Sequence, residues 1–324
     1  MSEDIFISAI ICTHCRPGSL NLLLESLTKQ TWQGKSWELL VIENDTQPSE
    51  EVRQVIESFK EQLPVRVLFD NIANLSRARN IGAREARGEY IAYLDDDCVA
   101  EPGWLNALIC GCKEYNPDFC AGPIYPIYRA KKPYWYKDEW GTYSYCGEEI
   151  VPTKIAPSGG NFIVRRNLAI ELGGFEERLG MSGRKVAYGE ETNLMMRARK
   201  SNPDIFIIYL PGAACRHEVF PSKMRINWCV KSAWATGRDC VMMGAWGYSA
   251  RSPIRMLKQL LLESLKLASK LPCLAGVAVA DVFRPGRGVW RRYMMESMVP
   301  IITRISISNS GLLARLRGVE IDNL

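Results

Sequence analysis

The chain has 324 residues, of which 47% are hydrophobic and 24% are charged, a balance that is ordinary for a globular protein. A net charge of +5 suits an anionic small substrate or a membrane surface, but it is too small and too scattered to predict a nucleic-acid partner. The 11 cysteines and 2 histidines lack the spacing of a zinc site, and no run of about 18 apolar residues predicts a membrane-spanning helix. Because no signal peptide precedes Ile5, we expect a cytoplasmic protein with reduced thiols.

Strand-like and helix-like stretches alternate through the first hundred residues. The β-branched, apolar run Ile5–Cys12 predicts a buried parallel strand, and the turn after it leads to a helix that we expect Ser19 to cap. Further strands are predicted over Trp37–Glu43, Val65–Phe69 and Tyr90–Leu94, with helices over 49–62 and 74–86 between them. This order predicts an α/β fold with a parallel, doubly wound sheet, in which ligands bind beyond the carboxyl ends of the strands.

Three of the predicted strands end in polar residues: Thr13 to Arg16, Glu43 to Asp45, and Asp95 to Asp97. Three adjacent carboxylates repel one another unless they are solvated or a cation lies among them, and oxygen ligands suit Mg²⁺ or Mn²⁺. Taken alone, the acidic triplet could equally be a solvated turn. No Gly-x-Gly-x-x-Gly follows the first strand and no Gly-Lys-Ser/Thr motif occurs, which disfavours dinucleotide and P-loop sites.

The order of these motifs carries more information than any one of them. A Thr-x-x-Arg turn, a Glu-Asn-Asp turn, Asn-Leu-Ser-Arg-Ala-Arg-Asn-x-Gly and Asp-Asp-Asp follow one another, and this series resembles the family 2 glycosyltransferases over roughly Ile5 to Gly237. The resemblance implies the GT-A fold, a Rossmann-like, mostly parallel sheet flanked by helices. It also implies Mn²⁺ or Mg²⁺ and inverting transfer of a sugar from a nucleotide-diphosphate sugar, with UDP-sugar the expected donor. The expected acceptor is a hydroxyl of a glycan or a lipid-linked molecule, as in bacterial polysaccharide or glycoconjugate synthesis.

The resemblance also assigns residues to the donor and the metal. Asp97 would bind the metal directly, and His217 would complete the metal or diphosphate site. The metal would neutralise charge on the leaving nucleoside diphosphate. The residues placed beside the nucleotide sugar are Thr13, Arg16, Asp45, Arg79, Asn80, Asp95, Asp96, Gly160 and Asn161.

A second informative motif is Tyr188-Gly-Glu-Glu-Thr. Glu190 and Glu191 open a helix predicted over 192–200, where the helix dipole stabilises carboxylates. The family usually has Gly-Glu-Asp here, and its Asp is the general base on the acceptor hydroxyl. Glu191 stands at the Asp position; a glutamate is a competent base, but its extra methylene moves the carboxylate by more than about an ångström. The base therefore stays open between Glu191 and Glu190.

Two regions outside the motifs allow more than one interpretation. The aromatic-rich segment Lys131–Tyr145 either borders the acceptor or forms a satellite hydrophobic cluster. Beyond about residue 248 the family pattern fades, and leucines among lysines and arginines predict basic amphipathic helices. Helices of this kind over 253–295 can lie in the interface on the inner face of the cell membrane, pack onto the domain, or form a homodimer.

We therefore expect a GT-A domain over residues 1–247, with a nucleotide-binding half over about 1–100 and an acceptor half over about 101–247. A basic helical region over 248–324 follows it. One alternative is a nucleotidyltransferase of related fold, which would be expected to carry a Gly-rich, Lys-bearing loop after the first strand. The other is a non-catalytic module that binds sugar nucleotides or membranes, which the glutamate at position 191 keeps open.

Overall fold

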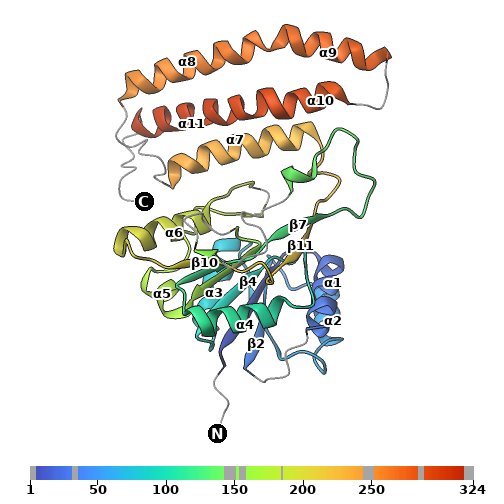
Figure 1. The fold of residues 1–324 in the computed structure, drawn as a ribbon, viewed down its shortest axis with the longest axis vertical. Helices are drawn as coiled ribbons and strands as arrows, with labels where there is room; N and C mark the ends of the chain where they lie inside the picture. Colours follow the sequence, from blue (N-terminus) through green and yellow to red (C-terminus); the bar gives the residue numbers. More distant parts are fainter. Residues whose placement is uncertain are drawn as a thin grey trace. The chain divides into compact units, whose positions relative to one another are not determined.

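The structure, a computed structural model, describes residues 5–30, 36–141, 151–152, 158–183, 185–243, 252–283 and 288–316 (Figure 1). The chain packs as two compact units. The first comprises Met1–Ile127, Gly141–Arg178 and Glu190–Glu218, and the second comprises Tyr128–Trp140, Leu179–Gly189 and Val219–Leu324.

The first unit is built on an eight-stranded sheet in the order β3-β2-β1-β4-β9-β6-β10-β8. Its strands are β1 (Ile7–Thr13), β2 (Trp37–Asn44), β3 (Val65–Asp70), β4 (Tyr90–Leu94), β6 (Phe119–Ala121), β8 (Val151–Pro152), β9 (Asn161–Arg165) and β10 (Ile207–Tyr209). The pairs among β3, β2, β1 and β4 are parallel, whereas β9 runs antiparallel to both β4 and β6. The predicted α/β class with a mostly parallel sheet is confirmed.

Helices cover both faces of this sheet because alternate residues of its strands point to opposite sides. Odd-numbered residues of β1 such as Ile7 and Ile11 join one buried cluster, and Ile10 joins the other. The first cluster includes side chains of α1 (Pro17–Thr28), α2 (Glu50–Glu57) and α4 (Trp104–Tyr115). The second includes side chains of α3 (Leu75–Glu85), α5 (Arg166–Glu171) and α6 (Glu190–Ser201).

Two predicted details of these elements were wrong. Helix α1 begins at Pro17, because proline at the first position has no N–H to satisfy, so Ser19 is not its cap. Helix α2 does begin after Ser49, whose hydroxyl accepts from the Val52 N–H, but it ends at Glu57 rather than at residue 62. The segment 119–127 forms two strands, β6 and β7 (Ile124–Ile127), which belong to different sheets.

A smaller sheet in the same unit contains β5 (Cys98–Ala100), β11 (Cys215–Glu218) and β7 (Ile124–Ile127), in the order β5-β11-β7. In this sheet His217 lies opposite Cys98, because β11 runs antiparallel to β5. The backbone N–H of Glu218 also donates to the carbonyl of Asp97 at 2.8 Å. The small sheet therefore brings His217 to the residues that directly follow β4.

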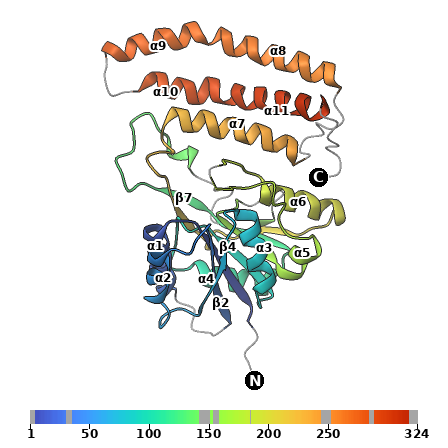
Figure 2. The ribbon, with the colours of Figure 1, turned by 180° about the vertical axis from the view of Figure 1, so that it is seen from behind.

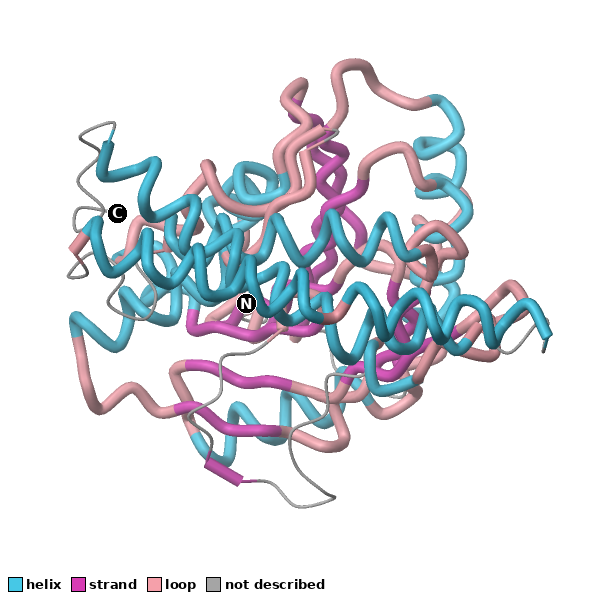
Figure 3. Tube along the Cα trace, turned by 90° about the horizontal axis from the view of Figure 1, so that it is seen from above, coloured by secondary structure: helices cyan, strands magenta, loops and turns pink. Residues whose placement is uncertain are grey.

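The second unit is mainly helical (Figures 2 and 3). Its helical elements are α7 (Ile226–Met242), α8 (Pro253–Ser269), α9 (Leu271–Phe283), α10 (Val289–Tyr293), a π-helical turn (Met294–Met298) and α11 (Val299–Leu316). Helix α11 packs between α7 and α8, and α10 packs on α9. No helix in the described part of the chain is both long and apolar enough to cross a membrane. The predicted boundary near residue 247 stays a prediction, although α7 already belongs to this helical unit.

Candidate active site

The acidic stretch after β4 meets the end of β1, its neighbour in the sheet. Asp96 and Asp97 are buried. The Thr13 hydroxyl donates to Asp96 at 2.8 Å, and the guanidinium of Arg16 donates to both Asp96 and Asp97 at 3.0 Å. Burial raises the pKa of Asp96 to about 6; Arg16 opposes this increase, and Asp97 adds to it. The predicted convergence of these two strand ends is therefore present in the structure.

A group of metal-ligating atoms lies in the same place. The carboxylates of Asp95 and Asp97 and the imidazole of His217 each offer an atom within 4.8 Å of the others, and His217 Nε2 is 3.1 Å from Asp97 Oδ1. Two carboxylates and one imidazole suit a divalent ion such as Mn²⁺. The donor set therefore fits the metal that the sequence predicts, and it adds Asp95 to the two predicted ligands.

Arg79 connects this group to the start of α6. Its side chain is only 2% exposed, and it donates to Glu190 at 2.7 Å, to Asp95 at 2.9 Å and to the carbonyl of Gly159 at 3.0 Å. The placement of Arg79 beside the nucleotide sugar stays a prediction; in the structure its guanidinium is bonded to protein groups. These charge-assisted hydrogen bonds hold the carboxylates of Glu190 and Asp95 in place.

The two glutamates that begin α6 have different surroundings. Glu190 is buried and paired with Arg79. The Oε2 atom of Glu191 is also buried, but it has no hydrogen-bond partner among the described residues. Burial raises the pKa of Glu191 to about 8; the neighbouring Glu190 adds to this increase, and Arg79 opposes it. Glu191 is therefore the carboxylate that still has an oxygen available to accept a proton.

The two glycines directly before β9 allow charged side chains of the site to lie close to the backbone. A Cβ on Gly159 would lie 3.2 Å from a guanidinium nitrogen of Arg79 and 3.4 Å from the carboxyl carbon of Glu191. A Cβ on Gly160 would lie 3.3 Å from Asp95 Oδ2. Sequence reasoning selected Gly160 and missed Gly159, although the Gly-Gly pair itself marks a close backbone approach.

Asn80 and Asn161 were predicted to bind the donor, but their amides are used to hold the fold. The side chain of Asn80 donates to the carbonyl of Phe175 at 2.9 Å and accepts from the N–H of Phe175 at 2.7 Å. Asn161 is fully buried; it accepts from the indole N–H of Trp104 at 3.0 Å and donates to the carbonyl of Ala213 at 2.7 Å. Buried amides with these partners stabilise loops. The role in donor binding stays a prediction for both residues.

Asp45 lies past the end of β2, where the sequence predicted it, beside the turn that follows β1. Cys15 Sγ contacts one oxygen of Asp45, and the N–H of Thr46 donates to the other at 2.7 Å. The contact with Cys15 lowers the pKa of Asp45, and the same contact raises the pKa of Cys15 to about 11. His14, Cys15 and Asp45 form a second group that could hold a metal ion. Sequence reasoning missed Cys15, whose left-handed backbone (φ 52°) turns its thiol towards Asp45.

Comparison with known proteins identifies the family. Residues 8–173, just over half of the chain, match the model of the family described as Glycosyl transferase family 2. The chain belongs to this family. The resemblance read from the sequence is therefore confirmed, and this protein is a glycosyltransferase, an enzyme that acts on nucleotide sugars. Family membership also removes the nucleotidyltransferase alternative.

Relatives of this family 2 glycosyltransferase are found in sequence and in structure. The glucosyl-dolichyl phosphate glucuronosyltransferase of Haloferax volcanii is 28% identical over 84% of this chain and 89% of its own length. The mannosyltransferase of Pyrobaculum calidifontis, solved with GDP-Man and Mn²⁺, has a TM-score of 0.61 at 13% identity, covering 94% of this chain and 88% of that one. Residues 1–349 of Staphylococcus aureus TarS, solved with UDP, give 0.51 at 15% identity, covering 97% and 92%. At these identities the two solved structures show a shared fold.

Residues 131–140 of the aromatic-rich segment of this glycosyltransferase belong to the second unit, where two of the aromatic side chains are buried. Trp135 and Tyr136 are buried with Val219 and Met224, as the satellite-cluster interpretation expects. Tyr134 is 74% exposed, so it could still meet a sugar. The two tyrosines at 143 and 145 lie outside the described residues.

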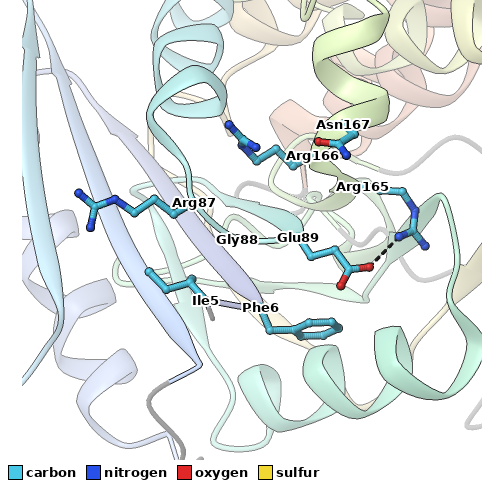
Figure 4. Close-up of a pocket in the computed structure, with 8 residues that line it drawn as sticks. All are labelled: Ile5, Phe6, Arg87, Gly88, Glu89, Arg165, Arg166 and Asn167. Carbon is cyan, nitrogen blue, oxygen red and sulfur yellow. Dashed lines mark hydrogen bonds and ion pairs between the residues drawn. The ribbon is translucent and has the colours of Figure 1, made fainter. Parts of the chain in front are cut away.

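Two cavities have linings that contain none of the carboxylates described above. One, of about 480 Å³, is lined by residues before β1 and β4 and at the end of antiparallel β9, so it lies at the opposite edge of the sheet (Figure 4). Arg165 faces it, but its guanidinium is paired with Glu89 at 2.7 Å. The other cavity, of about 660 Å³, belongs to the second unit and is lined by Lys231 and Trp234 of α7 and by the segment around Val186. Neither cavity contains a residue of the carboxylate site.

Proposed function

We propose that this enzyme transfers a sugar from a nucleotide-diphosphate sugar to a hydroxyl of a glycan or lipid-linked acceptor, in one inverting displacement that needs Mn²⁺ or Mg²⁺. The observation that carries the proposal is the buried oxygen of Glu191, which has no hydrogen-bond partner among the described residues, together with a group of three potential metal ligands. An inverting transfer needs a base for the acceptor hydroxyl and a way to stabilise the leaving diphosphate. Glu191 would supply the base, and a metal held by the three ligands would stabilise the leaving diphosphate.

Asp95, Asp97 and His217 would hold the divalent ion. When bound, such an ion acts as a Lewis acid that stabilises negative charge on the diphosphate. Arg16 lies beside the same carboxylates with a side chain that is 43% exposed, so its guanidinium can also meet a phosphate by charge-assisted hydrogen bonds. Thr13 and Asp96 support Arg16, and Asp45 lies near the same edge of the sheet as a partner for the base or ribose.

Glu191 is proposed as the general base in preference to Glu190. Glu190 would have to leave its ion pair with buried Arg79 before it could accept a proton, which would strand a buried charge. In the part of the chain that the structure describes, the Oε2 atom of Glu191 has no such partner, and a pKa of about 8 makes its carboxylate a stronger base than an exposed glutamate. Arg79 would act as a positioning residue, because it fixes Glu190 beside Glu191 and Asp95 beside Asp97.

The substrates are proposed by class. UDP is the expected nucleotide, in keeping with the UDP bound to the solved TarS structure, although the mannosyltransferase neighbour holds GDP-Man. A lipid-linked acceptor is in keeping with the dolichyl phosphate in the name of the Haloferax volcanii relative. A panel of UDP-, GDP- and dTDP-sugars with Mn²⁺, read as nucleotide release, would identify the donor.

The same assay tests the roles of the residues. With the best donor, we expect the Asp97→Ala variant to lose metal-dependent nucleotide release and the Glu191→Gln variant to release nucleotide about 10²–10⁴ times more slowly. Glu171→Gln, an exposed glutamate on α5, is the matched control and should release nucleotide at the wild-type rate. Donor binding without turnover, unchanged by Glu191→Gln, would instead support a non-catalytic binding module.

A further inference from the structure

Helix α8 exposes an apolar stripe. Ile254, Leu257, Leu261 and Leu265 are 68%, 47%, 57% and 69% exposed. Their spacing of three, four and four residues places them on one face of the helix. Isolated exposed leucines are common on proteins, but a continuous stripe of this length marks an interaction surface.

The side of α8 that is turned towards the protein is only partly apolar. Met256 is 2% exposed, and the side chain of Glu263 is 1% exposed. Glu263 accepts from Lys266 at 2.8 Å and from Arg304 of α11 at 2.9 Å. This arrangement differs from that of a helix that simply covers a core, because an acidic residue is inside and the leucines of the stripe are outside.

Helix α9 extends the apolar surface. Leu271, Val279 and Val282 are 53%, 58% and 75% exposed, and no charged residue occurs between Leu271 and Ala280. Asp281, the acidic residue of α9, accepts from the backbone N–H of Trp290 within the same unit. We call the outward side of the two helices the α8–α9 face, defined by the exposed apolar residues Ile254, Leu257, Leu261, Leu265, Leu271, Val279 and Val282.

The exposed charges that border the α8–α9 face have one sign. In the described residues of these two helices, the exposed charged side chains are those of Arg255, Lys258 and Lys266. The acidic residues of the helices, Glu263 and Asp281, are bonded within the unit. An apolar surface with a purely basic border complements the interface of an anionic bilayer, where long basic side chains reach the headgroups.

A second copy of the chain fits this face less well. In a two-fold symmetric dimer the same surface meets itself, so the basic border of one copy would face the basic border of the other. Like charges brought together in this way oppose association. A bilayer with anionic lipids has no such conflict, and because neither α8 nor α9 is long and apolar enough to span, the helices would lie in the plane of the interface.

We propose that the α8–α9 face docks the enzyme on an anionic lipid bilayer, with the leucine stripe among the acyl chains and Arg255, Lys258 and Lys266 at the headgroups. This proposal concerns only the second unit and does not depend on the catalytic roles assigned above. The sequence allowed three interpretations of these helices: membrane contact, packing onto the domain, or a homodimer. The proposal favours peripheral membrane contact.

Co-sedimentation of the full chain with vesicles tests the proposal. We expect the protein to bind phosphatidylcholine vesicles that contain phosphatidylglycerol at least ten times more strongly than pure phosphatidylcholine vesicles. The Leu257→Glu/Leu261→Glu/Leu265→Glu variant should lose at least nine tenths of that binding. The Arg255→Glu/Lys258→Glu variant should lose the preference for anionic vesicles. Ile170→Glu, at a residue of α5 that is 44% exposed, should bind as the wild type does.

Three results would overturn the proposal of membrane docking. The first two are no binding to either kind of vesicle and equal binding to both kinds. The third is a wild-type protein that binds no vesicles and forms a dimer, which the triple glutamate variant converts to monomers. The last would assign the face to a second copy, and light scattering would detect it. A milder variant, Leu261→Ser/Leu265→Ser, with an unchanged far-ultraviolet circular dichroism spectrum, guards against loss of binding through misfolding. It should reduce binding at least threefold.

Discussion

At the scale of single residues, the site depends on a difference between two adjacent glutamates. Glu190 is satisfied by Arg79, and Glu191 is left with a buried oxygen that has no partner in the described part of the chain. A buried acceptor without a partner costs stability, so its presence points to a ligand or to catalysis rather than to folding. The sequence left the base open between these residues, and the ion pair of Glu190 is what separates them.

The raised pKa of Glu191 predicts how activity depends on pH. A general base works only when deprotonated, so kcat/KM should rise with pH through about 8 and level off above it. At about pH 6 it should be roughly a hundredfold below the plateau, because each unit below the pKa removes about nine tenths of the deprotonated form. Initial rates with saturating metal measure this profile.

The Glu191→Gln variant is the control for the pH profile, because it keeps the size of the side chain and cannot titrate. Its much lower kcat/KM should vary little over the same pH range. A wild-type profile that is flat between about pH 6 and about pH 9 would contradict the assignment of Glu191 as the base.

Arg79 provides a prediction about stability. Replacing it with alanine leaves Glu190 buried without its partner and removes a bond to Asp95. Breaking a buried pair in this way should lower the free energy of unfolding of the first unit by about 3–5 kcal/mol, as measured by urea denaturation. Arg84→Ala, an exposed arginine of the same helix, should change it by less than about 0.5 kcal/mol. Equal effects of the two changes would show that the ion pair is not needed for stability.

At the scale of the elements, the sequence predicted what local patterns determine. The first four strands and the helices between them follow from apolar runs and turn residues, and their parallel order follows from the alternation of strand and helix. The antiparallel insertion of β9 between β4 and β6 was not predicted, because nothing in Asn161–Arg165 itself specifies its partners. The same is true of β11, which pairs with β5 although Cys215 and Cys98 are 117 residues apart in the chain.

The motifs do not reveal the contacts that their residues make with distant parts of the sequence. Arg79 meets Glu190 across 111 residues, and Asn80 meets Phe175 across 95. A resemblance to a family can place such residues near the donor, but it does not say which partners complete their hydrogen bonds. Asp95 to Asp97 were identified more easily, since a strand end followed by three carboxylates limits what those side chains can do.

The structural role of Asn161 can be tested by replacing it with alanine. The Asn161→Ala variant leaves the indole N–H of Trp104 and the carbonyl of Ala213 without this partner, in a fully buried place. Each unsatisfied group costs about 1–3 kcal/mol, so the variant should be less stable by about that amount or more in urea denaturation. The KM for the donor, measured on the folded protein, should stay within about twofold. Asn167→Ala, an exposed asparagine of α5, should change neither quantity.

A donor KM that rises tenfold or more in Asn161→Ala, with stability unchanged, would support the predicted role of Asn161 in donor binding. The two measurements therefore separate a residue that holds β9, α4 and the segment before β11 together from one that touches the substrate.

At the scale of the whole molecule, the proposed metal ligands and the proposed membrane face belong to different units. A ligand that binds only the native state stabilises it by RT ln(1 + [L]/Kd), which is about 2.7 kcal/mol at a hundredfold excess over Kd. That energy acts on the unit that holds the ligand. Asp95, Asp97 and His217 all lie in the first unit, which carries the sheet.

We therefore predict that Mn²⁺ and UDP together raise the melting temperature of the sheet-containing unit and leave that of the helical unit unchanged. For a unit of this size, about 2.7 kcal/mol corresponds to roughly 5–10 °C. Calorimetry of the full chain measures both transitions. The increase should vanish in Asp97→Ala and shrink in His217→Ala, whereas the matched exposed change Glu57→Ala, on α2, should keep it. An increase that survives Asp97→Ala would place the metal elsewhere, for example at the group of His14, Cys15 and Asp45.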